Sequence, residues 1–168
     1  MKLIIINGPC GVGKSTIAEK LHASMPLSYL LDIDAVSRNI SHYREYREER
    51  WELNVAIAKA TINAVLDLKR DIIVEKMIYA PETLDAYRKI GKEHGADVTE
   101  IILWAPKDVV MKRAEDRGWR EGLLTPEKCE MFWDKINELK DNRPEATIID
   151  ISALSEEDAL QTVQKEVI

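Results

Sequence analysis

A glycine-rich stretch that follows the first apolar run carries a lysine and two hydroxyl side chains in an order that suits phosphate binding. Residues 8–16, GPCGVGKST, fit the pattern G-x-x-x-x-G-K-[ST] at every fixed position. Its glycines permit backbone turns in which successive N–H groups point at phosphate oxygens, and the helix expected to follow adds its positive end. The pattern predicts that Lys14 contacts the β- and γ-phosphates of a nucleotide and that the Ser15 hydroxyl holds Mg²⁺. The residues expected to bind the nucleotide here are Gly8, Cys10, Gly11, Val12, Gly13, Lys14, Ser15 and Thr16.

Two aspartates, Asp32 and Asp34, end a second apolar run and are followed by Arg38. Ligands of parallel α/β sheets bind at the carboxyl ends of the strands, so a carboxylate there can face the γ-phosphate. We expect Asp34 to orient or deprotonate an acceptor hydroxyl, with Arg38 beside it at i+4, and Asp32 to support the magnesium site. The alternative is structural: Asp34 caps a helix, and Arg38 is its ion-pair partner on the surface.

The segment 41–53, SHYREYREERWEL, combines arginine with aromatic residues. Its arginines recur every three residues and are interleaved with two tyrosines and a tryptophan. Guanidinium and aromatic groups together suit a ring-bearing or phosphorylated acceptor, through stacking and bidentate hydrogen bonds. We therefore expect Arg44 and Arg47 to bind the acceptor. Three glutamates in the same segment leave a second interpretation open, a solvated helix start with many ion pairs.

Short apolar runs alternate with longer helical patterns along the chain, which predicts a parallel sheet built from βαβ units. Strands are expected at residues 2–6, 28–33, 71–75, 97–104 and 146–151, and their nearly continuous apolar composition is typical of strands buried on both faces. Helix starts are expected at Pro81, after Pro106 and at Pro126. Apolar residues at helical spacing predict buried stripes at Leu53, Ile57, Ala60, Ala64 and Leu68 of one helix and at Cys129, Phe132, Trp133, Ile136 and Leu139 of another.

Length and composition narrow the classes of function. The 168 residues predict one domain, residues 1–168, with a single well-buried core. A net charge of −6 disfavours non-specific binding to nucleic-acid backbones, which needs a basic face. Two distant cysteines favour a cytoplasmic location, and three scattered histidines disfavour a metal cluster. No apolar stretch reaches the roughly 20 residues of a membrane span.

The phosphate loop and the Asp-x-Asp after the second strand resemble those of the small P-loop kinases related to nucleoside-monophosphate, shikimate and gluconate kinases, polynucleotide kinase and chloramphenicol phosphotransferase-like enzymes. The resemblance implies a three-layer α/β fold with a five-stranded parallel sheet, in the order 2-3-1-4-5, flanked by helices and with a short arginine-bearing lid. The lid falls at about residues 117–126, and the acceptor-side segment falls at about 35–53. The glycine triplet that shikimate kinases carry after the third strand is missing, and IIVEKMIYAPETLDAYRK stands there instead.

The same resemblance implies roles for further residues. Arg113 and Arg117 are four apart on one face of an expected helix, and Arg120 follows three residues later. In related kinases a mobile lid supplies arginines that neutralise charge on the transferred phosphoryl group, which implies this role for Arg117 and Arg120, while Arg113 packs against adenine or the P-loop. Glu75, at the end of the third strand, is implied to face magnesium or the acceptor, and Ser152 lies where the backbone cradles adenine in the family. A solvated surface role is the alternative for the arginines and for Glu75.

These features predict an ATP- and Mg²⁺-dependent kinase that transfers the γ-phosphoryl group to a hydroxyl of a small molecule, such as a nucleoside or nucleotide, a sugar acid or an antibiotic-like compound. The guanine-binding pattern N-K-x-D of small GTPases is absent from the sequence. Two alternatives stay open. One is a 5′-hydroxyl polynucleotide kinase, which the acidic composition disfavours. The other is an ATP-binding resistance or regulatory protein without transfer activity, similar in layout to tunicamycin-resistance proteins.

Overall fold

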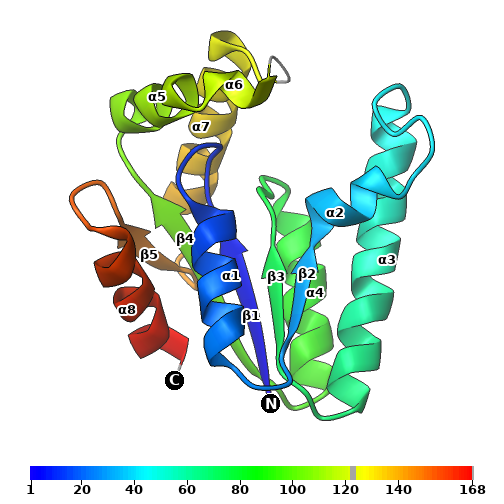
Figure 1. Ribbon diagram of the computed structural model, residues 1–168. Helices are drawn as coiled ribbons and strands as arrows, with labels where there is room; N and C mark the ends of the chain where they lie inside the picture. Colours follow the sequence, from blue (N-terminus) through cyan, green and yellow to red (C-terminus); the bar gives the residue numbers. More distant parts are fainter. Residues whose placement is uncertain (122–123, 168) are drawn as a thin grey trace.

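The computed structural model describes residues 1–121 and 124–167, without the side chains of residues 120 and 121. In this part of the chain, a five-stranded parallel sheet lies between two layers of helices (Figure 1). The strand order is β2-β3-β1-β4-β5, which confirms the order implied by the resemblance to P-loop kinases. The strands are β1 (Lys2–Asn7), β2 (Tyr29–Asp32), β3 (Ile72–Glu75), β4 (Asp97–Trp104) and β5 (Thr147–Asp150).

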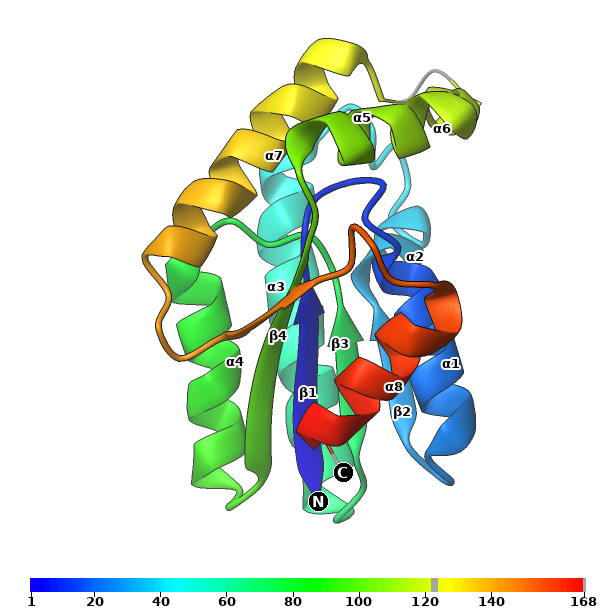
Figure 2. The ribbon, with the colours of Figure 1, turned by 90° about the vertical axis from the view of Figure 1, so that its left-hand side faces the viewer.

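Helices cover both faces of this sheet and its carboxyl edge. The pair α1 and α8 lies on one face, and α3 and α4 lie on the other (Figure 2). The helices α5 and α6 lie above the carboxyl ends of the strands. None of the helices in residues 1–121 and 124–167 is long and apolar enough to cross a lipid bilayer. The helices are α1 (Lys14–Ser24), α2 (Ile33–Arg38), α3 (Arg47–Asp67), α4 (Pro81–Glu93), α5 (Lys107–Asp116), α6 (Gly118–Glu121), α7 (Pro126–Asp141) and α8 (Glu156–Val167).

Alternate residues of the central strand β1 enter different layers of the core. Ile4 and Ile6 pack in a cluster with apolar residues of α1 and α8. Leu3 and Ile5, between them, pack in a second cluster with residues of α3 and α4. A strand that is covered on both faces buries every side chain, so its sequence is apolar throughout rather than alternating. This burial explains the run LIII at positions 3–6.

The predicted element boundaries agree closely with the structure. Every predicted strand end lies within one residue of the observed end. The helices α4 and α7 begin at Pro81 and Pro126 as predicted, and α5 begins directly after Pro106. The hydroxyl of Thr125 caps α7 by accepting a hydrogen bond from the Lys128 N–H at 3.3 Å. Proline and capping residues therefore gave reliable start signals in this chain.

The predicted buried stripe of α3 is out of register, by one residue at Leu53 and Ile57 and by two residues at Ala60, Ala64 and Leu68. Leu53 and Leu68 are exposed to solvent, although they were expected to pack on the sheet. The stripe that faces the core begins at a polar residue, and an apolar count therefore misses its register. The buried residues of α3 are Asn54, Ala58, Ile62 and Leu66. On α7 the predicted stripe agrees better, because Cys129, Ile136 and Leu139 are buried.

A buried ion pair joins the loop between α7 and β5 to the sheet. The side chain of Glu100, on β4, is fully buried, and Arg143 donates to both of its oxygens, at 2.5 Å from Nε and 2.9 Å from Nη2. Arg143 also lies 3.0 Å from a carboxylate oxygen of Asp85, on α4. Burial lowers the pKa of Arg143, but its contacts with Glu100 and Asp85 raise it overall above the ordinary value. The guanidinium of Arg143 therefore stays charged, and its contacts fasten β4, α4 and the start of β5 together.

Removing one partner of this pair should destabilise the protein strongly. We expect Arg143→Met to lower the free energy of unfolding by about 3–5 kcal/mol, because the buried carboxylate of Glu100 loses its bidentate partner. The double variant Glu100→Met/Arg143→Met should recover most of the loss, because the buried carboxylate is then removed as well. Urea denaturation followed by circular dichroism measures both variants. A loss below about 1 kcal/mol in Arg143→Met, typical of a surface pair, would contradict this role.

Candidate active site

The glycine-rich segment forms a loop between β1 and α1 at the carboxyl edge of the sheet (Figure 1). Gly8 has a φ of 146°, a conformation that L side chains rarely adopt, and a Cβ at this position would lie 2.3 Å from the Leu103 carbonyl oxygen. This close approach packs the loop against the end of β4. The amine of Lys14 donates to the Pro9 carbonyl at 3.0 Å, within the loop. The loop therefore presents its backbone and Lys14 at the edge where parallel sheets bind their ligands.

Asn7, the last residue of β1, joins this loop to the segment that follows β3. Its Oδ1 accepts hydrogen bonds from the N–H of Gly8 at 2.8 Å and the N–H of Ile78 at 2.9 Å. Its Nδ2 donates to the Ile78 carbonyl at 2.7 Å. The residue is completely buried, so these three bonds satisfy backbone groups that have no access to water. The sequence analysis did not identify Asn7.

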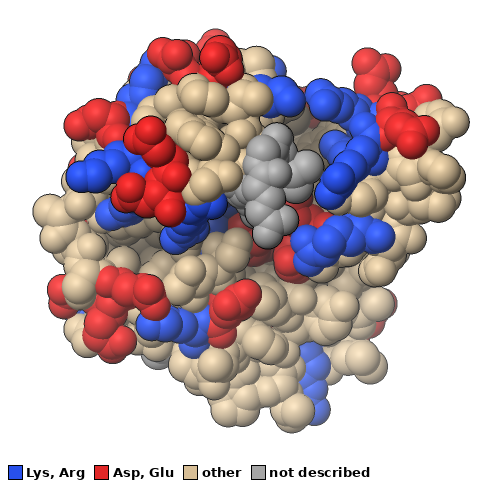
Figure 3. All heavy atoms as spheres, turned by 45° about the horizontal axis from the view of Figure 1, so that its top comes forward, with Lys and Arg blue, Asp and Glu red and all other residues tan. Residues whose placement is uncertain are grey.

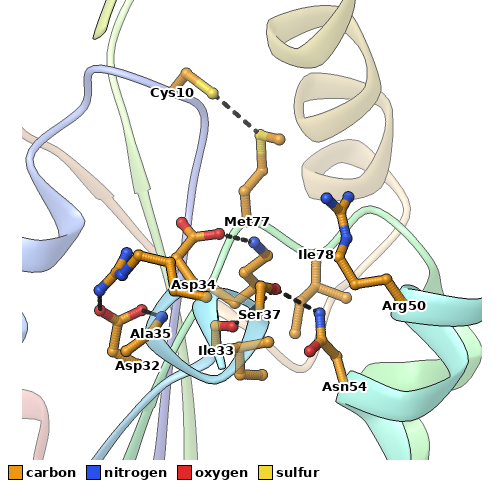
Figure 4. A network of polar contacts seen from close by, with 12 residues as sticks. Cys10, Asp32, Ile33, Asp34, Ala35, Ser37, Arg50, Asn54, Met77 and Ile78 are labelled. Atoms are coloured by element: carbon orange, nitrogen blue, oxygen red, sulfur yellow. Dashed lines mark hydrogen bonds and ion pairs between the residues drawn. The ribbon is translucent and has the colours of Figure 1, made fainter. Parts of the chain in front are cut away.

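The two aspartates at the end of β2 have different partners. Asp32 is the N-cap of α2: its Oδ1 accepts from the Ala35 N–H at 3.0 Å, and its Oδ2 lies 3.6 Å from a nitrogen of Arg38. Asp34, in the first turn of α2, forms an ion pair with Lys76. Figure 4 shows the two carboxylates pointing in different directions from the start of the helix. The structural alternative for Asp34, a cap paired with Arg38, is therefore wrong, because the helix begins before Asp34.

Glu75, the last residue of β3, lies beside Asp32 in the register of the sheet and is only 5% exposed. Burial raises the pKa of its carboxyl group above the ordinary value of 4.5. The positive charge of Lys14 opposes this rise, whereas the negative charges of Asp32 and Asp34 add to it. Glu75 is therefore close enough to Lys14 to interact with it electrostatically. The alternative of a charge that reaches solvent does not fit this burial.

The P-loop, α2, α3 and the lid border one cavity of about 710 Å³. Most of the predicted site residues meet here although they come from four separate parts of the chain. Figure 3 looks onto this end of the molecule and shows basic side chains on the side where α2 and α3 lie. The predicted site residues that line the cavity are Cys10, Gly11, Gly13, Lys14, Ser15, Thr16, Asp34, Arg38, Arg44, Glu75 and Arg117.

Several predicted nucleotide-binding residues lie outside this lining. The N–H of Gly8 donates a hydrogen bond to Oδ1 of Asn7, and the side chain of Val12 is buried in the core beneath the loop. Arg113, on α5, donates to the Ile151 carbonyl at 3.4 Å and so lies at the loop that contains Ser152. The structure thus places Arg113 beside the loop that follows β5 and contains Ser152. Neither residue lines the cavity.

The remaining predictions fall into three groups. Asp32 does not line the cavity, because its carboxylate is engaged by the start of α2 and by Arg38. Arg47, the first residue of α3, is exposed and does not line the cavity. The side chain of Arg120 and residues 122–123 of the predicted lid lie outside the described residues. Arg117 is therefore the lid arginine whose position at the cavity the structure describes.

The cavity also contains residues that the sequence analysis did not assign. From α3 come Arg50 and Asn54, and the segment after β3 contributes Lys76 and Tyr79. The ring of Tyr79 stacks on Phe132 of α7, with centroids 6.3 Å apart. Arg50 continues the three-residue arginine repeat, which gave a signal for it. Asn54 lies in the middle of the sequence of α3, and no local sequence pattern distinguishes it as a site residue.

Comparison with solved structures shows the same fold in several proteins. The tunicamycin resistance protein of Deinococcus radiodurans superposes with a TM-score of 0.65 at 19% identity, over 100% of this chain and 98% of that chain. The APS kinase CysC of Mycobacterium tuberculosis, in complex with AMPPNP and APS, gives 0.67 at 16% identity, over 98% and 95%. A gluconokinase from Sinorhizobium meliloti 1021 gives 0.67 at 17% identity, over 98% and 92%. These identities establish a shared architecture.

Sequence comparison places the chain in a family. A search of curated proteins found no match. The family model described as "AAA domain" matches residues 3–128, well over half of the 168 residues. The matched range contains the P-loop, the Asp34 region and Arg117 of the lid. The chain therefore belongs to this AAA domain family, and its P-loop and sheet order confirm the resemblance to small P-loop kinases.

Proposed function

We propose that the protein is an ATP-dependent kinase that transfers the γ-phosphoryl group of ATP to a hydroxyl of a small molecule. The observation that carries this proposal is the shared cavity, which Lys14 of a complete P-loop and Asp34 of α2 both line. A phosphate-binding lysine holds the phosphoryl donor, and a carboxylate in the same cavity orients the acceptor, as an in-line transfer requires. Arg117 lines the same cavity and adds a positive charge from the lid side. The proteins that share the fold include an APS kinase and a gluconokinase, which supports the proposal.

Each of these groups has a separate role in the proposed transfer step. The acceptor oxygen attacks the γ-phosphorus, the bond to the bridging oxygen breaks, and ADP leaves with the bond electrons. Asp34 orients the acceptor hydroxyl and takes its proton as the new bond forms. The ion pair with Lys76 holds the carboxylate of Asp34 at the end of β3, on the cavity side. Lys14 and Arg117 stabilise the negative charge on the transferred group.

The donor set of the cavity fits a magnesium ion that is held mainly by nucleotide phosphates. Within the described residues, no group of three or more His, Cys, Asp or Glu side chains could hold a metal by itself. Ser15 and the carboxylate of Glu75 line the cavity and offer the oxygen ligands that Mg²⁺ prefers. When bound, the ion neutralises charge on the β- and γ-phosphates. Asp32 is left out of this set because its oxygens are engaged elsewhere.

Substitutions of Lys14 and Asp34 should separate nucleotide binding from transfer. We expect Lys14→Ala to lose most ATP binding, because the P-loop then lacks its cation. Asp34→Asn should keep ATP affinity while transfer falls by about a hundredfold or more, because the amide cannot take the proton. Isothermal titration with ATP and a coupled ADP assay over a panel of nucleosides, sugar acids, antibiotics and 5′-hydroxyl oligonucleotides measure the two properties.

The control for Asp34→Asn is Asp97→Asn, which makes the same chemical change at the exposed start of β4, on the opposite edge of the sheet. Equal transfer rates in wild type and Asp34→Asn would remove Asp34 from its proposed role. ATP binding without transfer to any acceptor would favour the alternative of a resistance or regulatory protein. Transfer to oligonucleotides alone would favour a polynucleotide kinase.

Replacement of Glu75 should increase stability and decrease activity. Because the folded-state pKa of Glu75 is raised, the folded protein binds this proton more tightly than the unfolded chain, and its ionisation costs stability as the pH rises above 4.5. We therefore expect Glu75→Gln to be more stable than wild type at pH 8, with a smaller advantage at pH 5. Thermal unfolding at both pH values measures this difference. Transfer by Glu75→Gln should need more Mg²⁺, and a lower stability than wild type at pH 8 would contradict the argument.

A further inference from the structure

Two arginines of the acceptor-side segment converge on one aromatic ring at the cavity. The guanidinium carbon of Arg44 lies 5.5 Å from the ring centroid of Tyr43, and that of Arg50 lies 5.8 Å from the same centroid. Hydrogen bonds hold both: Arg44 Nε donates to the Tyr43 hydroxyl at 3.2 Å, and Arg50 Nη1 donates to the Tyr43 carbonyl at 2.9 Å. All three residues line the cavity. The ring of Tyr43 therefore places two positive charges beside each other in the wall of the cavity.

These two charges have no acidic partner. Within the described residues, no carboxylate lies within ion-pair distance of Arg44 or Arg50. The nearest glutamate in sequence, Glu45, pairs with His42 instead, at 3.4 Å. The interpretation of this segment as a helix start laced with ion pairs therefore fails for these arginines. Two neighbouring guanidinium groups that lack a counter-charge and face a cavity suit an oxyanion, which both can bind through paired N–H donors.

Asn54 supplies an independent sign that a ligand binds on this side of the cavity. Its Nδ2 donates to the Ser37 hydroxyl at 2.7 Å, and that hydroxyl donates its own proton to the Ile33 carbonyl at 3.1 Å. The direction of these bonds leaves Oδ1 of Asn54 as an acceptor. This oxygen is buried, and no donor within the described residues reaches it, although Asn54 lines the cavity. Figure 4 shows Asn54 and Arg50 leaving α3 on the side that faces Asp34.

We propose that the phosphoryl acceptor is a small anionic alcohol, whose oxyanion group is bound by Arg44 and Arg50 while its hydroxyl lies at Asp34. An N–H or a second O–H of the same molecule donates to Oδ1 of Asn54. The oxyanion is a phosphate, a sulfate or a carboxylate, since each offers two oxygens to a guanidinium. The proposal rests on the proposed kinase function for the role of Asp34. The anion site itself does not depend on transfer.

The first experiment compares acceptors that differ only in charge. Wild type is assayed for ADP release with nucleosides and their 5′-monophosphates, and with sugars, their aldonic acids and their phosphate and sulfate esters. We expect the anionic member of a pair to have the higher kcat/KM, and the pairs identify which oxyanion is used. Arg44→Gln and Arg50→Gln should each raise KM for that acceptor by about ten- to a hundredfold, the loss expected for one charged hydrogen bond, with little change in kcat.

The control variant is Arg70→Gln, which removes one exposed positive charge at the other end of α3 and should leave KM unchanged. The KM of the neutral member should also be unchanged in Arg44→Gln and Arg50→Gln. Equal kcat/KM values for neutral and anionic acceptors in wild type would overturn the proposal. So would an equal rise of KM for both members of a pair, which would indicate a general loss of structure in the segment.

A second experiment tests the anion site without activity. Lys14→Ala removes the P-loop cation, so inorganic phosphate should still raise the melting temperature of this variant through Arg44 and Arg50. The triple variant Lys14→Ala/Arg44→Gln/Arg50→Gln should lose this shift. An equal phosphate shift in both variants would place the anion elsewhere and overturn the proposal. If wild type transfers phosphate to no acceptor but the shift behaves as expected, the kinase function fails while the anion site stands.

Discussion

The side-chain amide of Asn7 is the contact on which the geometry of the whole edge depends. Two N–H groups and one carbonyl meet there in a place that water does not reach, and an asparagine can satisfy all three at once. One partner is the first residue of the P-loop, and the other is Ile78, two residues beyond Lys76. The amide therefore joins the segment that leads to Lys14 and the segment that contains Lys76.

The acidic side chains at the carboxyl edge of the sheet account for the positions of the basic side chains beside them. Parallel strands β2 and β3 end side by side, so the carboxylates of Asp32, Asp34 and Glu75 are brought close together by the topology alone. Three such charges repel one another. Arg38 lies beside Asp32, and Lys76 forms an ion pair with Asp34. Glu75 is left with Lys14, which a bound nucleotide would also attract. Burial of Glu75 next to a phosphate site is thus an electrostatic cost that a divalent cation can offset.

What could be predicted from the sequence was whatever is encoded locally. The P-loop is one continuous motif, and the helix starts at Pro81 and Pro126 are signalled by adjacent residues, so both were correct. The alternative that Asp34 caps α2 is wrong, and it could not be rejected from the sequence because Asp32 and Asp34 are both good caps that only the observed hydrogen bond distinguishes. Asn7 could not be found at all, since its partner Ile78 lies 71 residues away in the sequence. Its function depends on the pairing of β1 with β3.

The segment between Ser37 and Arg50 carries acceptor-side residues while contributing nothing to the apolar core. None of residues 37–50, all of which the structure describes, belongs to either core cluster. Apart from the buried and hydrogen-bonded Ser37, these residues are exposed or half-buried, and surface substitutions alter stability by only about 0.5 kcal/mol. The proposed nucleotide side, by contrast, is built into β1 and α1, whose apolar residues belong to the core. Evolution could therefore exchange one acceptor for another in this architecture by altering a single peripheral segment, without a compensating mutation elsewhere.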